Sequence, residues 1–396
     1  MRLFAAARNW TSIHERSWRL AGPLIFCWLC LAQPTLAAEG VATYTTGDWP
    51  VPGLGNVRAR VAVSEKADAV WAHIPWRRRD ARPENKDVIV VDAATGKRVN
   101  NVATVRVTRD YGDLLFQPPT APGEYYFYYL PFKTAGSWYF PTTIYLSPTN
   151  TAEADWTNRC APIIQRLREG QPPAVPAARL IDLQAINEFH RSGPMEVTAT
   201  SQETSEFMGK YGSRPYLLFP EDRRFPIRMT EELPLRWIQS GPERPFIGEA
   251  ARGEFYAFQV GLYACRDSVE AVQVEFSDLK GSGGATIPAA ALRCINVAGT
   301  NWLGKPMHKI VTVPKGKVQA FWCGVALPEQ TPAQTYRGKV SFKPKNAPAA
   351  AIELEITVSE AALADAGDGE IWRQSRLRWL DSTIGLDDEV FAPYTP

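Results

Sequence analysis

The stretch NVRARVAV, residues 56–63, decides the fold class of this chain. Val57 and every second residue after it are small and apolar, whereas Arg58 and Arg60 fill positions between them. Successive side chains of a strand point to opposite faces, so this alternation predicts a β-strand with one buried and one solvated face.

Six further runs of strand character follow, at 69–74, 88–92, 103–107, 114–116, 124–130 and 143–146. Turn-forming sequences such as 94–97 and Pro122-Gly123 separate them. Seven short strands at this spacing predict a β-sandwich over residues 40–149. The run YYFYY at 125–129 places aromatic residues on both faces of one strand, so we expect at least one of those faces to be covered by other parts of the chain.

A second series of runs predicts a second β-sandwich over residues 215–360, with strands near 254–263, 272–276, 293–297, 309–313, 318–325, 337–342 and 352–358. Helical spacing is expected between the two series, from Asn150 as the cap up to a stop at Gly170, and again over 178–190. The predicted fold class is therefore all-β, with two tandem β-sandwich domains, a partly helical connecting segment at 150–214, and a linker-like tail at 361–396.

Charge and composition exclude some classes of partner. The chain has 44 basic and 42 acidic side chains among 396 residues, a formal net charge of +2. This balance indicates neither a nucleic-acid backbone nor another polyanion as a partner. With 32 prolines and 28 glycines, the chain is rich in the turn-formers of β-sandwiches.

The N-terminal residues have the pattern of an export signal. Arg16 and Arg19 precede the apolar run 20–32, and small residues around Ala37 suit a signal peptidase. We therefore expect a signal peptide at 1–37 and a periplasmic or extracellular protein, with an uncleaved anchor as the alternative. No membrane span is expected in the mature chain.

Removal of that segment leaves Cys160, Cys265, Cys294 and Cys323. Four cysteines allow three pairings, and their spacing fits no metal motif, so buried thiols with at most one disulfide are expected. The three histidines of the mature chain are isolated, which argues against a histidine metal site or a Ser/His/Asp triad. No phosphate loop, dinucleotide fingerprint or nucleophile elbow is present, so no cofactor is predicted.

Carbohydrate contacts are the chemistry that the residue types leave open. Glycoside hydrolysis uses carboxyl groups, but the acidic clusters give no specific signal and are interpreted as solvated: Glu203 and Glu206, Glu231 and Glu232, and Asp387, Asp388 and Glu389. Tryptophan rings stack on sugars, which makes Trp71, Trp76, Trp138 and Trp302 candidate carbohydrate contacts, although a tryptophan within a strand is more often core. Arg77-Arg78-Arg79 is interpreted as a solvated loop or a domain contact, with an anionic ligand as the alternative.

Several phrases resemble the N-terminal, non-catalytic region of bacterial family-123-like glycoside hydrolases: AVWAHIPWRRRD (69–80), VIVVDAATGKRV (88–99), PGEYYFYYLPF (122–132), RGEFYAFQVGLYA (252–264) and RLRWLDSTIGLDDEVFAPYTP (376–396). The resemblance implies that the sandwiches precede a (β/α)8 barrel. That barrel would remove N-acetylgalactosamine with help from the substrate's own acetamido group, through an adjacent Asp-Glu pair.

A barrel of this type needs about 250 residues, and none follow Pro396. We therefore expect an accessory portion truncated before its catalytic barrel, with no catalytic residue in this chain, and Asp388-Glu389 is not matched to the barrel's pair. The expected partners are a carbohydrate and a separate or missing catalytic domain. The alternative is a stand-alone carbohydrate-binding or cell-surface β-sandwich protein, and whether the chain is itself an enzyme stays open.

Overall fold

Strand β2 (Val57–Val63) lies inside the first of the sheets, as its alternation predicts. The computed structural model describes residues 41–300 and 305–381. The chain divides into two units, residues 1–41 and 42–396, and the structure described below belongs to the second. The predicted signal peptide therefore lies outside the described residues.

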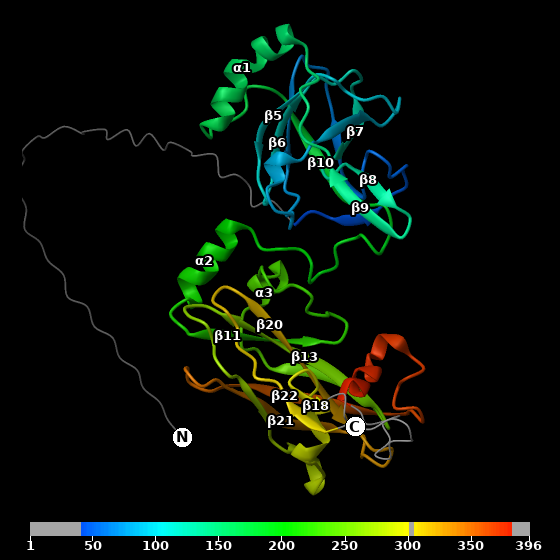
Figure 1. Cartoon of the computed structure of the whole chain (residues 1–396), viewed down its shortest axis with the longest axis vertical. Helices are drawn as coiled ribbons and strands as arrows, with labels where there is room; N and C mark the ends of the chain where they lie inside the picture. The colour runs from blue at the N-terminus through cyan, green and yellow to red at the C-terminus, as the bar shows by residue number, and fades with distance from the viewer. Residues whose placement is uncertain (1–40, 301–304, 382–396) are drawn as a thin grey trace, which may run out of the picture. The chain divides into compact units, whose positions relative to one another are not determined.

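The first sheet has the strand order β4-β7-β2-β10-β3-β6-β5, and β1 pairs with β10. Its strands are β1 (Tyr44–Thr46), β2, β3 (Val70–Ile74), β4 (Ile89–Asp92), β5 (Val102–Val107), β6 (Gly112–Phe116), β7 (Gly123–Tyr128) and β10 (Ala177–Ala185). β10 starts in parallel with β3 at Ala177 and then runs antiparallel to β2, with a bulge between Leu180 and Asp182. This one strand thus connects the two layers of the sandwich (Figure 1).

The prediction of a helix at 178–190 was wrong, because this segment contains β10. Four successive residues of β10, from Asp182 to Ala185, are buried. Since both faces of the strand are covered, the period-two alternation that marks a strand is lost, and a helix-like spacing of apolar residues remained in the sequence. Phe189, near the end of the predicted helix, is 91% exposed.

Arg58 also departs from its expected solvated position. Its guanidinium lies 3.6 Å from the ring centre of Tyr126 and 4.3 Å from that of Trp49, and its Nε donates to Gln184 Oε1 at 2.8 Å. The second face of β2 is therefore covered at this point. The aromatic run of β7 is likewise covered on both faces, as expected for at least one of them: Tyr125 and Phe127 face the main core, and Tyr128 packs with Trp49.

The helix predicted from residue 150 is α1 (Ala154–Arg168). It begins after Glu153, while Asn150 accepts a hydrogen bond from the Ala152 backbone N–H at 3.1 Å. Trp156 and Cys160 are buried against Leu115 and its neighbours on β5 and β6, so α1 covers the outer face of that layer (Figure 1).

The second sandwich has two layers. One has the order β11-β13-β20-β17 and the other β12-β22-β21-β15-β16, with β14 paired to β21. The strands are β11 (Tyr216–Asp222), β12 (Phe246–Arg252), β13 (Phe255–Ala264), β14 (Gln273–Phe276), β15 (Leu279–Lys280), β16 (Thr286–Ile287), β17 (Leu292–Cys294), β20 (Val318–Ala326), β21 (Thr335–Lys343) and β22 (Ala350–Ala362). Short strands β18 (Ala298–Thr300) and β19 (Pro306–His308) pair with each other. The all-β sandwich class is confirmed.

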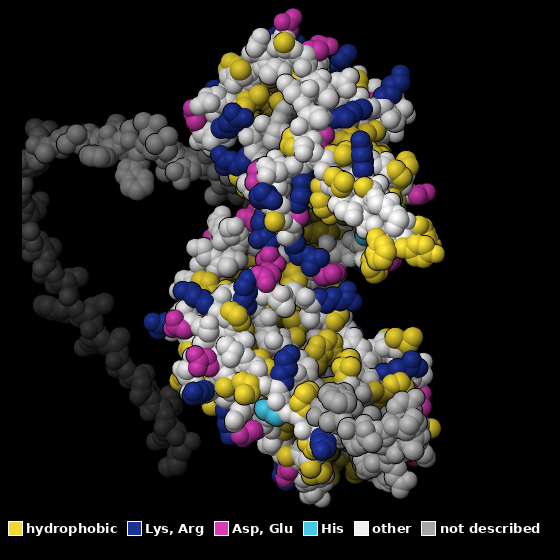
Figure 2. Space-filling view, in the orientation of Figure 1, with side chains coloured by type: hydrophobic (Ala, Val, Ile, Leu, Met, Phe, Trp, Pro, Cys, Tyr) yellow, Lys and Arg dark blue, Asp and Glu magenta, His cyan; other side chains and the backbone are white. Residues whose placement is uncertain are grey.

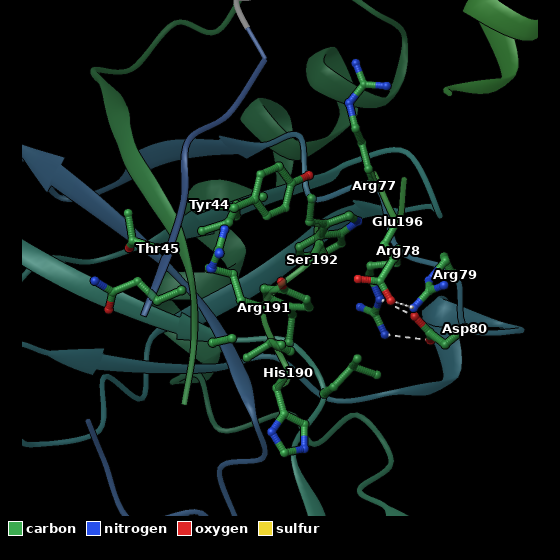
Figure 3. Close-up of a pocket in the computed structure, with 17 residues that line it drawn as sticks. Tyr44, Thr45, Arg77, Arg78, Arg79, Asp80, His190, Arg191, Ser192 and Glu196 are labelled. Atoms are coloured by element: carbon green, nitrogen blue, oxygen red, sulfur yellow. Dashed lines mark hydrogen bonds and ion pairs between the residues drawn. The ribbon is translucent and has the colours of Figure 1, made fainter. Parts of the chain in front are cut away.

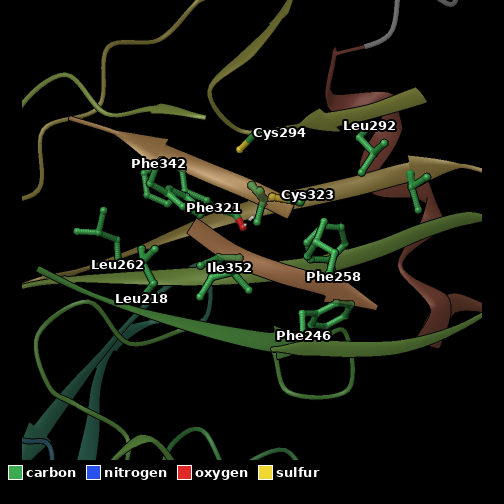
Figure 4. Close-up of a cluster of buried hydrophobic side chains, with 14 of the residues drawn as sticks. Leu218, Phe246, Phe258, Leu262, Leu292, Cys294, Phe321, Cys323, Phe342 and Ile352 are labelled. Atoms are coloured by element: carbon green, nitrogen blue, oxygen red, sulfur yellow. Dashed lines mark hydrogen bonds between the residues drawn. The ribbon is translucent and has the colours of Figure 1, made fainter. Parts of the chain in front are cut away.

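The inner faces of the two layers share one large core. Phe258 and Leu262 of β13, Phe321 of β20 and Phe342 of β21 meet there, with Ile352 of β22 (Figure 4). All ten residues of β13 are buried, which requires its outer face to be covered as well.

Two helices provide that cover. α2 (Ser201–Tyr211) and α3 (Leu235–Ser240) pack Phe207 and Trp237 against Phe219 of β11, and the Trp237 and Phe219 rings stack 4.3 Å apart. α2 begins with a capping box, because the Thr200 hydroxyl accepts from Glu203 N while the Glu203 carboxylate accepts from Thr200 N.

The first part of the predicted tail is attached to the second sandwich. Short 3₁₀ helices at Ile371–Arg373 and Ser375–Asp381 follow β22. Arg373 Nη1 lies 3.1 Å from Glu254 Oε1, and Gln374 Nε2 donates to Arg223 O at 3.0 Å. Asp387, Asp388 and Glu389 lie outside the described residues.

Candidate functional site

A cluster of exposed aromatic side chains sits on a two-stranded hairpin, β8 (Phe132–Ser137) and β9 (Phe140–Tyr145), which forms its own sheet. Its register pairs Phe132 with Tyr145 and Ser137 with Phe140, so Trp138 and Tyr139 form a two-residue turn. At the base, Gly53 N donates to Phe132 O at 3.1 Å and Asp87 N to Leu146 O at 2.8 Å. These bonds attach the hairpin to the first sandwich (Figure 1).

The turn and the first residue of β9 expose three successive aromatic side chains: Trp138 is 87%, Tyr139 78% and Phe140 81% exposed. Figure 2 shows hydrophobic side chains gathered over this hairpin. We call Trp138, Tyr139 and Phe140 the aromatic tip. Two-residue hairpin turns favour Asn, Asp and Gly, so turn geometry does not explain these aromatics. Contiguous apolar side chains that are exposed to this degree mark interaction sites.

The four tryptophan candidates have different environments. Trp138 is in the aromatic tip. Trp76 is 2% exposed and its indole N–H donates to Thr108 O at 2.9 Å, so neither ring face is open to a ligand. Trp71 is half-buried against the α1 side of the first sandwich, with its N–H 3.2 Å from Asp113 Oδ1. Trp302 lies outside the described residues.

A pocket of about 210 Å³ lies where Arg77, Arg78 and Arg79 approach the segment 190–196 (Figure 3). Arg78 is buried, forms two hydrogen bonds of 2.8 and 2.9 Å with Asp80, and lies over the Trp76 ring. Asp80 also accepts from Lys86. The expectation of a solvated loop is therefore wrong for Arg78.

Arg77 serves as a contact to the second sandwich rather than as a pocket cation. It extends away from the other labelled side chains in Figure 3 and binds the Glu203 carboxylate through Nη1 and Nη2 at 2.6 and 2.9 Å. Burial alone would raise the pKa of Glu203, but these bonds and the Thr200 contacts outweigh it and lower that pKa. Glu203 is consequently a carboxylate at neutral pH, unsuited to act as a general acid.

The other acidic candidates also have partners. Glu232 pairs with Arg109 and Glu231 with Lys317, while the exposed Glu206 accepts from Gln202. The ion pairs of Glu203, Glu231 and Glu232 favour a structural role for these carboxylates over a role in hydrolysis. Within 41–300 and 305–381, no group of three or more His, Cys, Asp or Glu is placed to hold a metal ion.

None of the helices in the described part of the chain is long and apolar enough to cross a membrane.

Burial raises the pKa of Tyr44 to about 12, with Arg77 acting in the opposite direction, so the phenol that lines the 210 Å³ pocket stays neutral at physiological pH. Arg77 and Arg78 at this pocket already bind Glu203 and Asp80, whereas the aromatic tip is open to solvent, so the aromatic tip is the better candidate for a binding surface.

Sequence reasoning found Trp138 but missed Tyr139 and Phe140. The signal was present in Ser137-Trp138-Tyr139-Phe140-Pro141, where large aromatics occupy a turn position that normally takes small polar residues.

Comparison with known proteins gives one family match. Residues 47–186 match the model of the N-terminal domain of glycoside hydrolase 123. This range contains most of the first sandwich, the hairpin and β10. No curated protein matches the chain.

Solved structures give distant similarities. A family 123 glycoside hydrolase from Clostridium perfringens, studied for glycolipid glycan hydrolysis, is 12% identical over 37% of this chain and 28% of its own length, with a TM-score of 0.30. An endo-fucoidan hydrolase of glycoside hydrolase family 107 is 8% identical, over 71% of this chain and 24% of that one, with a TM-score of 0.20. A type I cohesin from Pseudobacteroides cellulosolvens is 13% identical, over 30% and 90%, with a TM-score of 0.16.

These TM-scores are low, so the resemblance rests on the family model. The expected resemblance is confirmed for residues 47–186, which match the N-terminal domain of glycoside hydrolase 123.

Proposed function

We propose that this chain is the exported accessory portion of a glycoside hydrolase system acting on N-acetylgalactosaminides, and that it contacts carbohydrate through the aromatic tip. The observation that carries the proposal is the 87% exposure of Trp138 at a turn that does not need an aromatic residue. The family match of residues 47–186 supports the choice of carbohydrate as the ligand class.

The chemistry of the hairpin suits a sugar. An indole ring offers a flat apolar face for the C–H side of a pyranose, and the hydroxyl groups of the sugar then need polar partners. Thr134 and Thr143, which are cross-strand partners, and Thr142 are exposed and offer hydroxyl groups that both donate and accept. Lys133 is the sole charged residue between Glu124 and Glu153, which suits a neutral ligand such as N-acetylgalactosamine.

Affinity electrophoresis tests the contact. The purified full chain is run through gels containing a polymer that displays terminal N-acetylgalactosamine, and through gels with the matching galactose polymer. We expect retardation in the first gel, loss of it in Trp138→Ala, and no loss in Trp379→Ala. Trp379 is a suitable control because it is 50% exposed but lies in the second 3₁₀ helix of the tail.

Two results would contradict the proposed carbohydrate contact. The first is a wild-type chain that is retained by no glycan polymer, and the second is Trp138→Ala retained as strongly as wild type. Release of a chromogenic group from an N-acetylgalactosaminide by the purified chain would contradict the accessory role, since it would require a catalytic site in this chain.

The alternative, a stand-alone carbohydrate-binding protein, differs in its relation to catalysis. A family-123 catalytic domain is therefore assayed with and without this chain on polymer-bound and on small soluble N-acetylgalactosaminides. An accessory role predicts faster release from the polymer alone, because the chain concentrates the enzyme on that surface. Binding without any change in release would favour the stand-alone function.

A further inference from the structure

Two of the four buried cysteines in the described part of the chain face each other across neighbouring strands. Cys294, the last residue of β17, is the direct Cα partner of Cys323 in the middle of β20. Residues directly opposite on antiparallel strands point to the same face of the sheet. Both belong to the core between the two layers of the second sandwich, and Figure 4 shows both sulfur atoms on that side.

The hydrogen-bond pattern shows which of the two types of antiparallel residue pair Cys294 and Cys323 form, and it is the type with the shorter Cα–Cα separation. The next ladder bond runs from Ile295 N to Trp322 O at 2.7 Å. Hydrogen-bonded and non-hydrogen-bonded pairs alternate along an antiparallel ladder, so Cys294 and Cys323 form a non-hydrogen-bonded pair, for which the Cα atoms lie about 4.5 Å apart. Disulfides need Cα atoms roughly 4.4–6.8 Å apart, so the backbone already meets the requirement.

The surroundings of the sulfur atoms agree with this proximity. Cys323 is fully buried and Cys294 is 5% exposed. Burial first, and then the neighbouring Cys294 thiol, raise the pKa of Cys323 well above its usual value. The two thiols make only long, weak hydrogen bonds to oxygen: Asn296 Oδ1 lies 3.5 Å from Cys294 Sγ, and Phe321 O lies 3.7 Å from Cys323 Sγ.

The remaining cysteines have no such neighbour among the described residues. Cys160 lies on the buried face of α1 against the first sandwich, and Cys265 belongs to the cluster beneath α2 and α3. Each of the two lies in a different apolar cluster from Cys294 and Cys323.

We propose that Cys294 and Cys323 are a disulfide site that joins β17 to β20 and leaves Cys160 and Cys265 as thiols. In the reaction, the two S–H bonds break and one S–S bond forms. A disulfide-bearing oxidant, protein or small molecule, accepts the two electrons and is reduced to two thiols, and the two protons pass to it.

The bond forms during folding, while the thiols are still accessible, because attack requires a thiolate and the folded core disfavours that charge. The closed loop has about 30 residues, a length for which cross-linking restricts the unfolded chain strongly. The inference does not depend on carbohydrate binding, so a failure of either proposal leaves the other to be judged on its own test.

Peptide mapping of the full chain, produced in a disulfide-forming bacterial compartment, tests the inference. The protein is acid-quenched, denatured, alkylated without reductant, digested and analysed by mass spectrometry. We expect one linked peptide pair that contains Cys294 and Cys323 and separates on reduction, with Cys160 and Cys265 alkylated. Complete alkylation of Cys294 and Cys323 before reduction, or linkage of either one to Cys160 or Cys265, would overturn the inference.

Two variants test the specificity. In Cys265→Ala the linked pair should persist unchanged. In Cys323→Ala, Cys294 should become fully alkylated and form no new link; a link from Cys294 to another cysteine would refute the geometric assignment. If Cys323→Ala does not accumulate, the wild-type and Cys265→Ala maps still decide between the outcomes. A thermal midpoint that falls on addition of dithiothreitol in wild type and Cys265→Ala, but not in Cys323→Ala, gives an independent check.

Discussion

Replacement of Glu254 by Gln should destabilise the second sandwich strongly, because this side chain holds two arginines in a buried position. Glu254 is buried, and its Oε1 accepts from Nη1 of both Arg223 and Arg373. Its Oε2 accepts from the Ala251 backbone N–H at 2.7 Å. Glutamine keeps the shape of the side chain but removes its charge.

The magnitude follows from the burial of the partners. The Arg223 side chain is 4% exposed, so after the substitution its charge has no carboxylate and little water. Breaking a buried pair by removing one partner costs roughly 3–5 kcal/mol. Arg373 is 15% exposed, and the Tyr256 ring 4.5 Å from the Arg223 guanidinium retains part of the stabilisation. We therefore expect about 3 kcal/mol.

Equilibrium unfolding in urea, followed by tryptophan fluorescence, measures the change. A loss of about 3 kcal/mol corresponds to a thermal midpoint roughly 6–12 °C lower, at about 2–4 °C per kcal/mol for a domain of this size. The urea midpoint should fall, while the slope of the free energy of unfolding against urea concentration should change little, because the surface exposed on unfolding stays the same.

The matched control is Glu355→Gln in the same sandwich. Glu355 accepts from Arg337 Nε at 3.0 Å, but the two side chains are 36% and 67% exposed. Exposed pairs contribute roughly 0–1 kcal/mol, so this variant should unfold near wild type. Equal effects of the two substitutions would refute the reasoning that burial of the partner charges sets the cost.

Two further predictions concern glycine positions and pH. Gly112→Ala should lower stability by at least about 2 kcal/mol, since the added Cβ would lie 2.1 Å from the Trp76 ring. Gly209→Ala should raise stability by about 0.5–1 kcal/mol, because the added Cβ would lie in open space within α2. Urea midpoints that shift in the same direction for the two variants would contradict this pair of predictions. For Asp92, burial acts to raise the pKa, but the hydrogen bonds from Thr120 Oγ1 and backbone N–H groups outweigh it and lower the pKa. Because the folded pKa lies below the unfolded value of about 3.9, Asp92 stabilises the fold above that pH and loses this effect as the pH falls further. The stability gap between wild type and Asp92→Asn, measured at several pH values, should therefore shrink below about pH 4, and a constant gap would contradict the assignment.

Local sequence patterns were sufficient to predict strands that have one solvent-exposed face or clear turn signals at their ends. β2, β4, β13 and β22 fall within three residues of their predicted runs or better, except that β22 extends to Ala362. β13 is also buried on both faces, but its unbroken run of apolar and aromatic residues marked it as a strand. β10 was missed because its buried half contains the polar residues Asp182 and Gln184, and β11 and β12 had no predicted counterpart. Burial on two sides removes the alternation on which such predictions depend.

The sequence by itself determined the all-β class, the likeness to family-123 proteins and the set of candidate residues, because strand periodicity and turn chemistry act over a few residues. Only the tertiary structure separated exposed Trp138 from buried Trp76 and brought Cys294 opposite Cys323. Exposure and pairing depend on which distant strand or helix lies against a residue, and the register that places it there is set by the packing of whole layers rather than by neighbours along the chain.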